Sequence, residues 1–237
     1  MPIVRRSWFA FALVTAILGL EALTTFYPAV HGQLVQSFGL SGPDLAHLEV
    51  YRLVVSPLVQ TRPGFVGTVW ITLLFVAPVA AWRLGAWRSA IVYFLGDWAG
   101  SLLILMTLGA ASLLGSTSAH QYWTTHDVGS SSGVYALGFA AALTLPGRVR
   151  VAVVAAVIAV FTSRVVIAGR VFDYQHAVSL AAAVGVVRLM SLGHAPNDLI
   201  PQAGKYGPRT QGPRARSHCS APESIAEDLL DRSNQRT

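Results

Sequence analysis

The chain has 237 residues, of which 53% are hydrophobic and only 12% are charged. An ordinary soluble domain carries roughly 25% charged residues, so the composition excludes a typical water-soluble globular protein. The formal net charge of +6 would suit a nucleic-acid partner, but the lysines and arginines lie between and after apolar blocks. That placement is typical of membrane topology signals, so we expect the lipid bilayer, and no nucleic acid, as a partner.

The apolar residues are grouped in blocks, and a helix needs roughly 20 mainly apolar residues to cross the hydrocarbon core. A long interruption, 29–63, follows the first block, and its apolar pairs predict short interfacial helices. A polar and aromatic loop is expected at 115–127. We therefore expect an all-α membrane protein with about six transmembrane helices. Their predicted ranges are 8–28, 64–82, 89–114, 128–145, 151–169 and 175–192.

The basic residues predict the orientation of these spans. With the N-terminus inside, the outer segments hold only Arg52, Arg62 and Arg170. The other basic residues lie in inner segments, apart from Arg164 within the fifth span. The positive-inside rule therefore predicts a multi-pass protein of the cell membrane with both termini in the cytoplasm. Residues 1–192 are expected to form the transmembrane domain. Residues 193–237 are expected to be a disordered, basic cytoplasmic tail, because they offer little apolar surface to bury.

Ionisable residues inside a membrane span are costly, which makes them candidates for function. Here they are Glu21, Asp97, Arg164 and His176. Each also has a structural interpretation, in which the two acids are protonated or paired inside the bundle. Arg164 would then extend toward the interface or pair with an acid such as Asp97 or Asp127.

A serine and a histidine occupy matching positions in two of the spans. The fourth block begins with Gly129-Ser130-Ser131-Ser132-Gly133, and His176 lies near the start of the sixth. Both spans are expected to run from outside to inside, so Ser131 and His176 should lie at similar depth. Histidine is well suited to accept a serine proton near neutral pH. The alternative is that the small residues serve close helix packing and that the histidine is a satisfied interior residue or a proton relay.

Four short motifs follow one another along the chain: Tyr51-Arg52, Arg83-Leu84-Gly85, Gly129-x-Ser131 with Tyr135-Ala136-Leu137, and His176 with Ser179 and Ala183. In this order they resemble the rhomboid family, the intramembrane serine proteases with a six-helix fold and a long loop after the first helix. Tyr51-Arg52 resembles the family's Trp-Arg pair, and Arg83-Leu84-Gly85 resembles its Arg-x-Gly. Gly129-x-Ser131 with Tyr135-Ala136-Leu137 resembles the nucleophile motif, and His176 with Ser179 and Ala183 resembles the histidine helix. The resemblance covers roughly residues 45–190.

The resemblance implies a role for each matching residue. Ser131 would be the nucleophile and His176 the general base. Gly129, Ser132, Tyr135, Arg52 and Arg83 would support them, with the Tyr135 ring packed beside the histidine. No cofactor and no metal are implied. The substrate or client would be a transmembrane protein.

The departures from the family pattern concern mainly the groups around this pair. Ser132 replaces the glycine after the nucleophile, and Ala81 replaces an acid. The family's oxyanion-stabilising His and Asn correspond to Phe65 and Val69, whose side chains donate no hydrogen bond. Losing one oxyanion donor typically costs about 100- to 1000-fold in rate. Backbone amides near Ser131, or Thr68, would be the remaining substitutes.

Three hypotheses follow. The first is an active rhomboid-like intramembrane serine protease that uses a Ser/His dyad. The second is a rhomboid-like pseudoprotease that binds transmembrane helices. The third is a small transporter or proton-coupled protein using Asp97, Arg164 and His176, although no inverted repeat supports it. A polar donor near the oxyanion of Ser131 would favour the enzyme, whereas an acid–Arg164–His176 chain would favour the third hypothesis.

Overall fold

The computed structural model of the chain describes residues 2–62 and 66–192, with the side chains of 7–62 and 73–191. This part of the chain is helical, and its one β-type contact is an isolated bridge between Leu40 and Asp127. The α-helices are α1 (Pro2–Phe26), α2 (Pro28–Phe38), α3 (Gly42–Ala46), α4 (Arg52–Val55), α5 (Val66–Leu84), α6 (Ala86–Leu113), α7 (Thr117–Thr124), α8 (Ser131–Leu143), α9 (Gly147–Ile167) and α10 (Val171–Leu192). A single 3-10 turn, η1 (Ser56–Leu58), follows α4.

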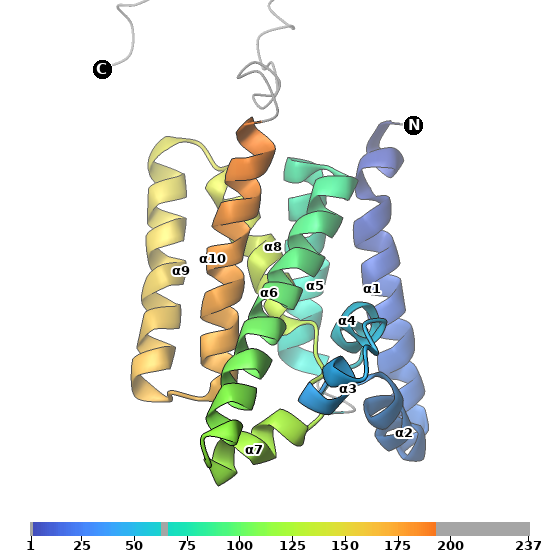
Figure 1. Ribbon diagram of the computed structural model, residues 1–237. Coiled ribbons are helices and arrows are strands. Elements are labelled where there is room, and N and C mark those ends of the chain that lie inside the picture. The colour runs from blue at the N-terminus through green and yellow to red at the C-terminus, as the bar shows by residue number, and fades with distance from the viewer. Residues whose placement is uncertain (1, 63–65, 193–237) are drawn as a thin grey trace, which may run out of the picture. The chain divides into compact units, whose positions relative to one another are not determined.

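The long helices lie side by side, and the short helices α2, α3, α4 and α7 gather toward one end of the bundle (Figure 1). The chain begins at the opposite end, and α10 finishes at that same end. We call the end with α2, α3 and α7 the loop end. Both α8 and α10 start from the side of the loop end, so the helices that carry Ser131 and His176 run in the same direction.

Three helices in the described part of the chain are long and apolar enough to cross a membrane. They are Ser7–Phe26 within α1, Ala86–Leu113 and Gly147–Ile167. Two shorter apolar helical stretches are Leu73–Leu84 and Ser131–Leu143. The prediction of a helical protein with apolar, membrane-compatible helices is therefore confirmed, while a total of six crossings stays a prediction.

Two predicted boundaries are wrong, each for a physical reason. The segment predicted as a loop at 115–127 contains the helix α7, which begins at an N-cap where the Ser116 hydroxyl accepts a hydrogen bond from the Ala119 N–H. The predicted span 128–145 begins as a helix only at Ser131, because Gly129 has a φ of 134°, which no α-helix accommodates. The segment before α8, residues 128–130, is therefore not helical.

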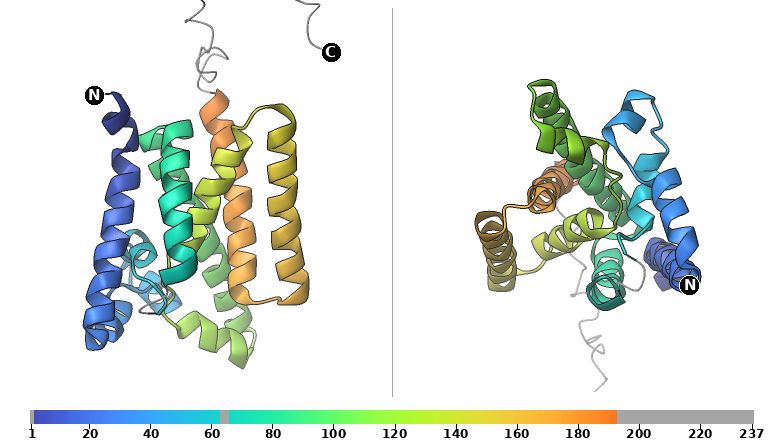
Figure 2. Two further views of the ribbon diagram at one scale, coloured as in Figure 1. Left: turned by 180° about the vertical axis from the view of Figure 1, so that it is seen from behind. Right: turned by 90° about the horizontal axis from the view of Figure 1, so that it is seen from below.

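The central helix α6 packs most extensively against α10 and α8, and Figure 2 shows it between them and α1. Its glycines allow this close approach. A Cβ added at Gly96 would overlap the Cβ of Ala136 in α8, and one at Gly100 would lie 2.5 Å from the Ser179 hydroxyl in α10. Ser179 and Ala183 of α10 are both fully buried. At Ser179, the required space is provided by a glycine of the facing helix.

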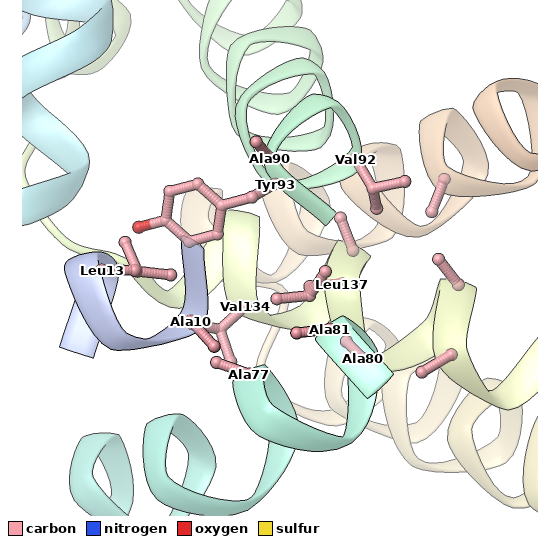
Figure 3. Packing of buried hydrophobic residues seen from close by; sticks show 14 of the residues in the cluster. Ala10, Leu13, Ala77, Ala80, Ala81, Ala90, Val92, Tyr93, Val134 and Leu137 are labelled. Carbon is pink, nitrogen blue, oxygen red and sulfur yellow. The ribbon is translucent and has the colours of Figure 1, made fainter. Parts of the chain in front are cut away.

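The apolar core joins α1, α5, α6 and α8 through small side chains (Figure 3). Ala77, Ala80 and Ala81 of α5 are almost completely buried there, against larger partners such as Leu137. Small residues let membrane helices approach one another closely. Ala81, which the resemblance matches to an acid, is thus a core residue in this chain.

The segment between α1 and α5 is organised around Arg52, as a structured loop with short helices. Arg52 is buried and donates hydrogen bonds to the carbonyls of Gln36 at 2.8 Å and Gly39 at 2.7 Å. Its guanidinium also pairs with Glu49 at 2.6 Å and with Asp44 at 3.6 Å. Because one fixed, planar group serves four partners, Arg52 holds this segment in one conformation.

Candidate active site

The segment before α8 is held against the loop after α4 by backbone and side-chain hydrogen bonds. The Gly129 N–H donates to the Ser56 carbonyl at 3.2 Å. The Thr61 hydroxyl donates to the Val128 carbonyl at 3.1 Å. Because buried backbone groups outside helices need partners in the protein, these bonds hold the non-helical segment against the bundle and fix where α8 starts.

Ser131 is the first helical residue of α8. Its neighbours Ser130 and Ser132 are buried, with exposed fractions of 1% and 2%, whereas Ser131 is exposed. The Ser131 hydroxyl Oγ lies 2.9 Å from Nε2 of His176 in α10. Of the three consecutive serines, the one that the resemblance implies as the nucleophile is therefore both accessible and hydrogen-bonded to the histidine.

His176 is 7% exposed and is enclosed by aromatic rings. The ring of Tyr135, one turn after Ser131, packs edge-on to the imidazole at a centroid distance of 4.8 Å. Phe161 of α9 lies 6.1 Å from the imidazole and 4.9 Å from the Tyr135 ring. These rings hold the imidazole in place and keep one side of it apolar.

The second imidazole nitrogen, Nδ1, is buried and has no hydrogen-bond partner among the described residues. For Nε2 to accept the Ser131 proton, the imidazole proton must reside on Nδ1. A third, carboxylate member of the kind found in Ser-His-Asp triads is therefore not in place here. The described arrangement is a dyad.

An ion pair joins α9 to α10 close to the histidine. The Arg164 Nε donates to Oδ1 of Asp173 at 3.0 Å, and the Arg170 N–H donates to Oδ2 at 3.3 Å. Asp173 is 1% exposed. The suggestion that Arg164 pairs with Asp97 or Asp127 is thus wrong, since the short turn between the two helices brings a nearer acid, Asp173, to the guanidinium.

A buried polar cluster lies between α6, α8 and α10. The Gln175 amide donates to the Ser101 hydroxyl at 2.9 Å and to the Asp127 carboxylate at 3.0 Å. Asp97 accepts a hydrogen bond from the Gly133 N–H in the first turn of α8. Burial raises the pKa of the Asp127 carboxyl to about 6, although hydrogen bonds from Gln175 and the Val128 N–H partly oppose this. The cluster holds α8 and α10, the helices that carry Ser131 and His176, against α6.

Two other predicted residues lie away from the dyad. Both carboxylate oxygens of Glu21 are buried with no hydrogen-bond partner among the described residues. The Arg83 guanidinium stacks over the Trp82 ring at 4.8 Å, at the end of α5. Arg83 therefore supports the fold, as Arg52 does in the segment between α1 and α5, and neither arginine lies at Ser131.

Phe65 lies outside the described residues, and so do the side chains of Thr68 and Val69 and the tail, 193–237.

Two further residues, which no sequence motif indicated, contact the site. Phe161 joins the aromatic cluster around the histidine. Gln60 lies beside Ser130, with its amide Nε2 3.4 Å from the serine hydroxyl. No motif signalled either contact, because both join segments far apart in the chain.

Two cavities flank this site. An apolar one of about 400 Å³ lies between α8, α9 and α10, lined by Phe139, Phe161 and Leu180 among others. A smaller one of about 40 Å³ is lined in part by Ser101, Asp127 and Gln175. Most of the surface that lines this smaller cavity is apolar. In the described residues, no cluster of histidine, cysteine or acidic side chains is suited to hold a metal ion.

No family model matches the chain, and no characterised protein and no solved structure shows a significant match to it. What the site can do chemically therefore follows from its own geometry. That geometry is a helical, membrane-compatible bundle in which an accessible serine at a helix start is hydrogen-bonded to a buried histidine of another helix.

Proposed function

We propose that the protein is a rhomboid-like intramembrane serine protease that cleaves transmembrane protein substrates through a Ser131–His176 dyad. The observation that carries this proposal is the 2.9 Å contact between Ser131 Oγ and His176 Nε2. A nucleophile and a base within hydrogen-bond distance are the signature of nucleophilic catalysis. The resemblance of motifs between residues 45 and 190 to the rhomboid family adds to it.

In the proposed reaction, Ser131 Oγ attacks the carbonyl carbon of a peptide bond while its proton moves to His176 Nε2. The carbonyl π electrons move to the oxygen, which becomes an oxyanion. When the C–N bond breaks, the imidazolium gives its proton to the leaving amine, and an acyl-enzyme ester remains on Ser131. A water molecule then attacks the ester with His176 again as base, which releases the new carboxylate and restores the serine.

This chemistry requires water at the serine. Ser131 is exposed, so water can reach its hydroxyl. The short length of α8 supports the same idea. Its 13 residues span about 20 Å, less than the roughly 30 Å hydrocarbon core. We propose that α8 starts below the membrane surface, with Ser131 in a wet recess that opens toward the loop end.

The proposed topology has six spans formed by α1, α5, α6, α8, α9 and α10, with both termini in the cytoplasm of a cell-membrane protein. The support comes from the distribution of arginines and from the way α10 finishes at the end of the bundle where α1 begins. The loop end would then face outward, so substrates would be cut near the outer surface of the membrane.

A catalytically impaired pseudoprotease that binds transmembrane helices is the second candidate. The observation that favours it is the identity of Phe65 and Val69, which provide no side-chain donor where the family has an oxyanion-stabilising His and Asn. The binding of a membrane helix requires only the bundle, whereas cleavage requires the oxyanion to be stabilised.

Cleavage in proteoliposomes separates the two candidates. Purified wild-type protein, Ser131→Ala and His176→Ala are each reconstituted with a library of fluorescent single-span reporters. We expect fragments only with the wild type, and we expect reporter cross-linking to all three proteins. Equal cross-linking without any fragment from the wild type would support the pseudoprotease. Fragments from Ser131→Ala would contradict the assignment of the nucleophile.

A further inference from the structure

An active dyad needs hydrogen-bond donors for the oxyanion, and the chain lacks them at the two family positions. Preorganised donors in a site of low polarity typically account for about 100- to 1000-fold in rate each. If the proposed protease activity is real, another group must supply this stabilisation. The described residues place one uncharged carboxamide at the start of α8, on Gln60.

We propose that the Gln60 side-chain amide is the oxyanion donor for the reaction at Ser131, an inference that rests on the proposed function. Gln60 is 7% exposed and follows η1 in the segment that packs along residues 128–130. Its Nε2 lies 3.4 Å from the hydroxyl of Ser130, the residue immediately before the nucleophile. The same hydroxyl lies 3.5 Å from the Gln60 Oε1.

The backbone around Gln60 is fixed on both sides, so the amide is preorganised. The Gln60 carbonyl oxygen lies 3.0 Å from Nε2 of His31 in α2. The next residue, Thr61, donates its hydroxyl to the Val128 carbonyl. A donor held in place by such contacts needs little reorganisation when charge develops, which is the source of the catalytic benefit.

The Gln60 amide also has a second N–H that can bind a substrate oxygen. A carboxamide nitrogen carries two N–H donors, and the structure gives Nε2 a single acceptor among the described residues, the Ser130 hydroxyl. Being uncharged, the amide can be buried at much lower cost than an arginine or lysine. A second N–H can therefore point at a substrate oxygen without the desolvation cost of an ion.

The direction of α8 places a second donor at the same end. The N–H groups of the first helical turn have no partner within the helix and point out of its N-terminus. The Gly133 N–H already donates a hydrogen bond to Asp97. The N–H of Ser131, the first helical residue, has no partner within the helix. Gln60 contacts Ser130, the N-cap of this helix. The Ser131 N–H and the Gln60 amide therefore form the proposed oxyanion site, favoured further by the helix dipole.

The experiment measures the second-order rate of labelling by a fluorophosphonate and kcat and KM for a cleaved reporter, on the full-length protein in detergent. Gln60→Met keeps the length and burial of the side chain but removes both N–H groups. Gln60→Glu keeps its shape and an acceptor for Ser130 but replaces the donor by a carboxylate. Ser130→Ala removes the contact to Gln60 and leaves the amide; Ser130 makes no side-chain cap bond to α8.

We expect both Gln60 variants to lose about 100-fold in kcat and in labelling rate with KM nearly unchanged, because only the transition state carries the oxyanion. Ser130→Ala should stay within about threefold of the wild type, since it removes no proposed donor. Wild-type rates in Gln60→Met and Gln60→Glu would overturn the inference while leaving the proposed function intact. An equal loss in Ser130→Ala would also overturn it, because Gln60 would then act only by holding the loop.

An unlabelled, folded wild type would instead overturn the proposed function, and the inference with it. Thermal unfolding of each variant shows whether the fold is kept. If Gln60→Met fails to fold, Gln60→Glu decides, because it can still accept the Ser130 hydrogen bond.

Discussion

At the scale of single residues, Ser131 differs from its two neighbouring serines in exposure and in its contact with an imidazole. Ser130, Ser131 and Ser132 are chemically identical, yet only Ser131 is exposed and touches an imidazole. The difference follows from the helix start. Because α8 begins at Ser131, successive side chains point in different directions, and one of them faces His176.

Tyr135 offers a test of how the imidazole is positioned. Its ring contacts both His176 and Phe161, and aromatic pairs contribute about 0.5–1.5 kcal/mol beyond burial. Tyr135→Phe keeps the ring and should label with a fluorophosphonate within about twofold of the wild-type rate. Tyr135→Ala should lose roughly tenfold, through a freer imidazole. Equal rates in the two variants would show that the ring does not position the histidine.

Asp127 gives the fold a predictable response to pH. Burial raises the pKa of its carboxyl to about 6 in the folded protein, against about 3.9 when unfolded. A raised pKa of an acid means that its contribution to stability is complete below about pH 4 and is lost as the pH rises through about 6. Asp127→Asn stays uncharged and can still accept the hydrogen bond from Gln175.

The difference in unfolding temperature between Asp127→Asn and the wild type, measured in detergent, should therefore be larger at about pH 7.5 than at about pH 4.5. The variant should gain stability relative to the wild type at the higher pH. A difference that does not change with pH would show that Asp127 is solvated or already neutralised.

At the scale of elements, hydropathy was sufficient to place the long helices within a few residues, because each needs an apolar run. It could not place α7, whose sequence is polar, nor the start of α8, which is set by the positive φ of Gly129. The contact of Arg164 with Asp173 was also missed, because residues nine apart meet only through the turn between α9 and α10. The sequence predicts that Ser131 and His176 lie at similar depth, because each lies near the start of a predicted span and the two predicted spans run in the same direction.

Helix packing at Gly96 can be tested against a matched glycine. A Cβ at Gly96 would overlap that of Ala136 in α8, while one at Gly19 in α1 meets nothing within 4 Å. Gly96→Ala should therefore lower stability by about 1–3 kcal/mol through overpacking. Gly19→Ala should be neutral or stabilise by up to about 1 kcal/mol through helix propensity. Unfolding curves in detergent measure both, and an unharmed Gly96→Ala would contradict the close packing of α6 on α8.

At the scale of the whole molecule, the helices differ in how deeply they are buried. Helices α1, α5, α6, α8 and α10 contribute the packed core, while α9 has only one buried residue, Phe161, and packs against α8 and α10. The composition predicted a membrane protein because 12% charge cannot cover a water-exposed surface. The oxyanion donor could not be predicted, since Gln60 and Ser130 are joined only by folding.

The proposed orientation can be measured with a pair of cysteines in a Cys219→Ser background. Gln121→Cys lies in α7 at the loop end, and Arg148→Cys lies at the start of α9, at the opposite end; both positions are exposed. A membrane-impermeant maleimide added to intact cells should label Gln121→Cys and not Arg148→Cys, which should react only after permeabilisation. The reverse pattern would contradict cytoplasmic termini, and labelling of both would contradict a membrane between them.

The central claim is that His176 activates Ser131. Its most direct test is fluorophosphonate labelling of the purified protein in detergent, with the labelled residue located by peptide mass spectrometry and with Ser131→Ala, His176→Ala and Ser130→Ala in parallel. We predict a single phosphonylated residue, Ser131, with labelling abolished in the first two variants and retained in the third. An unmodified wild type that is folded, beside a labelled serine protease as control, would contradict the account and leave a bundle that binds membrane helices without cleaving them.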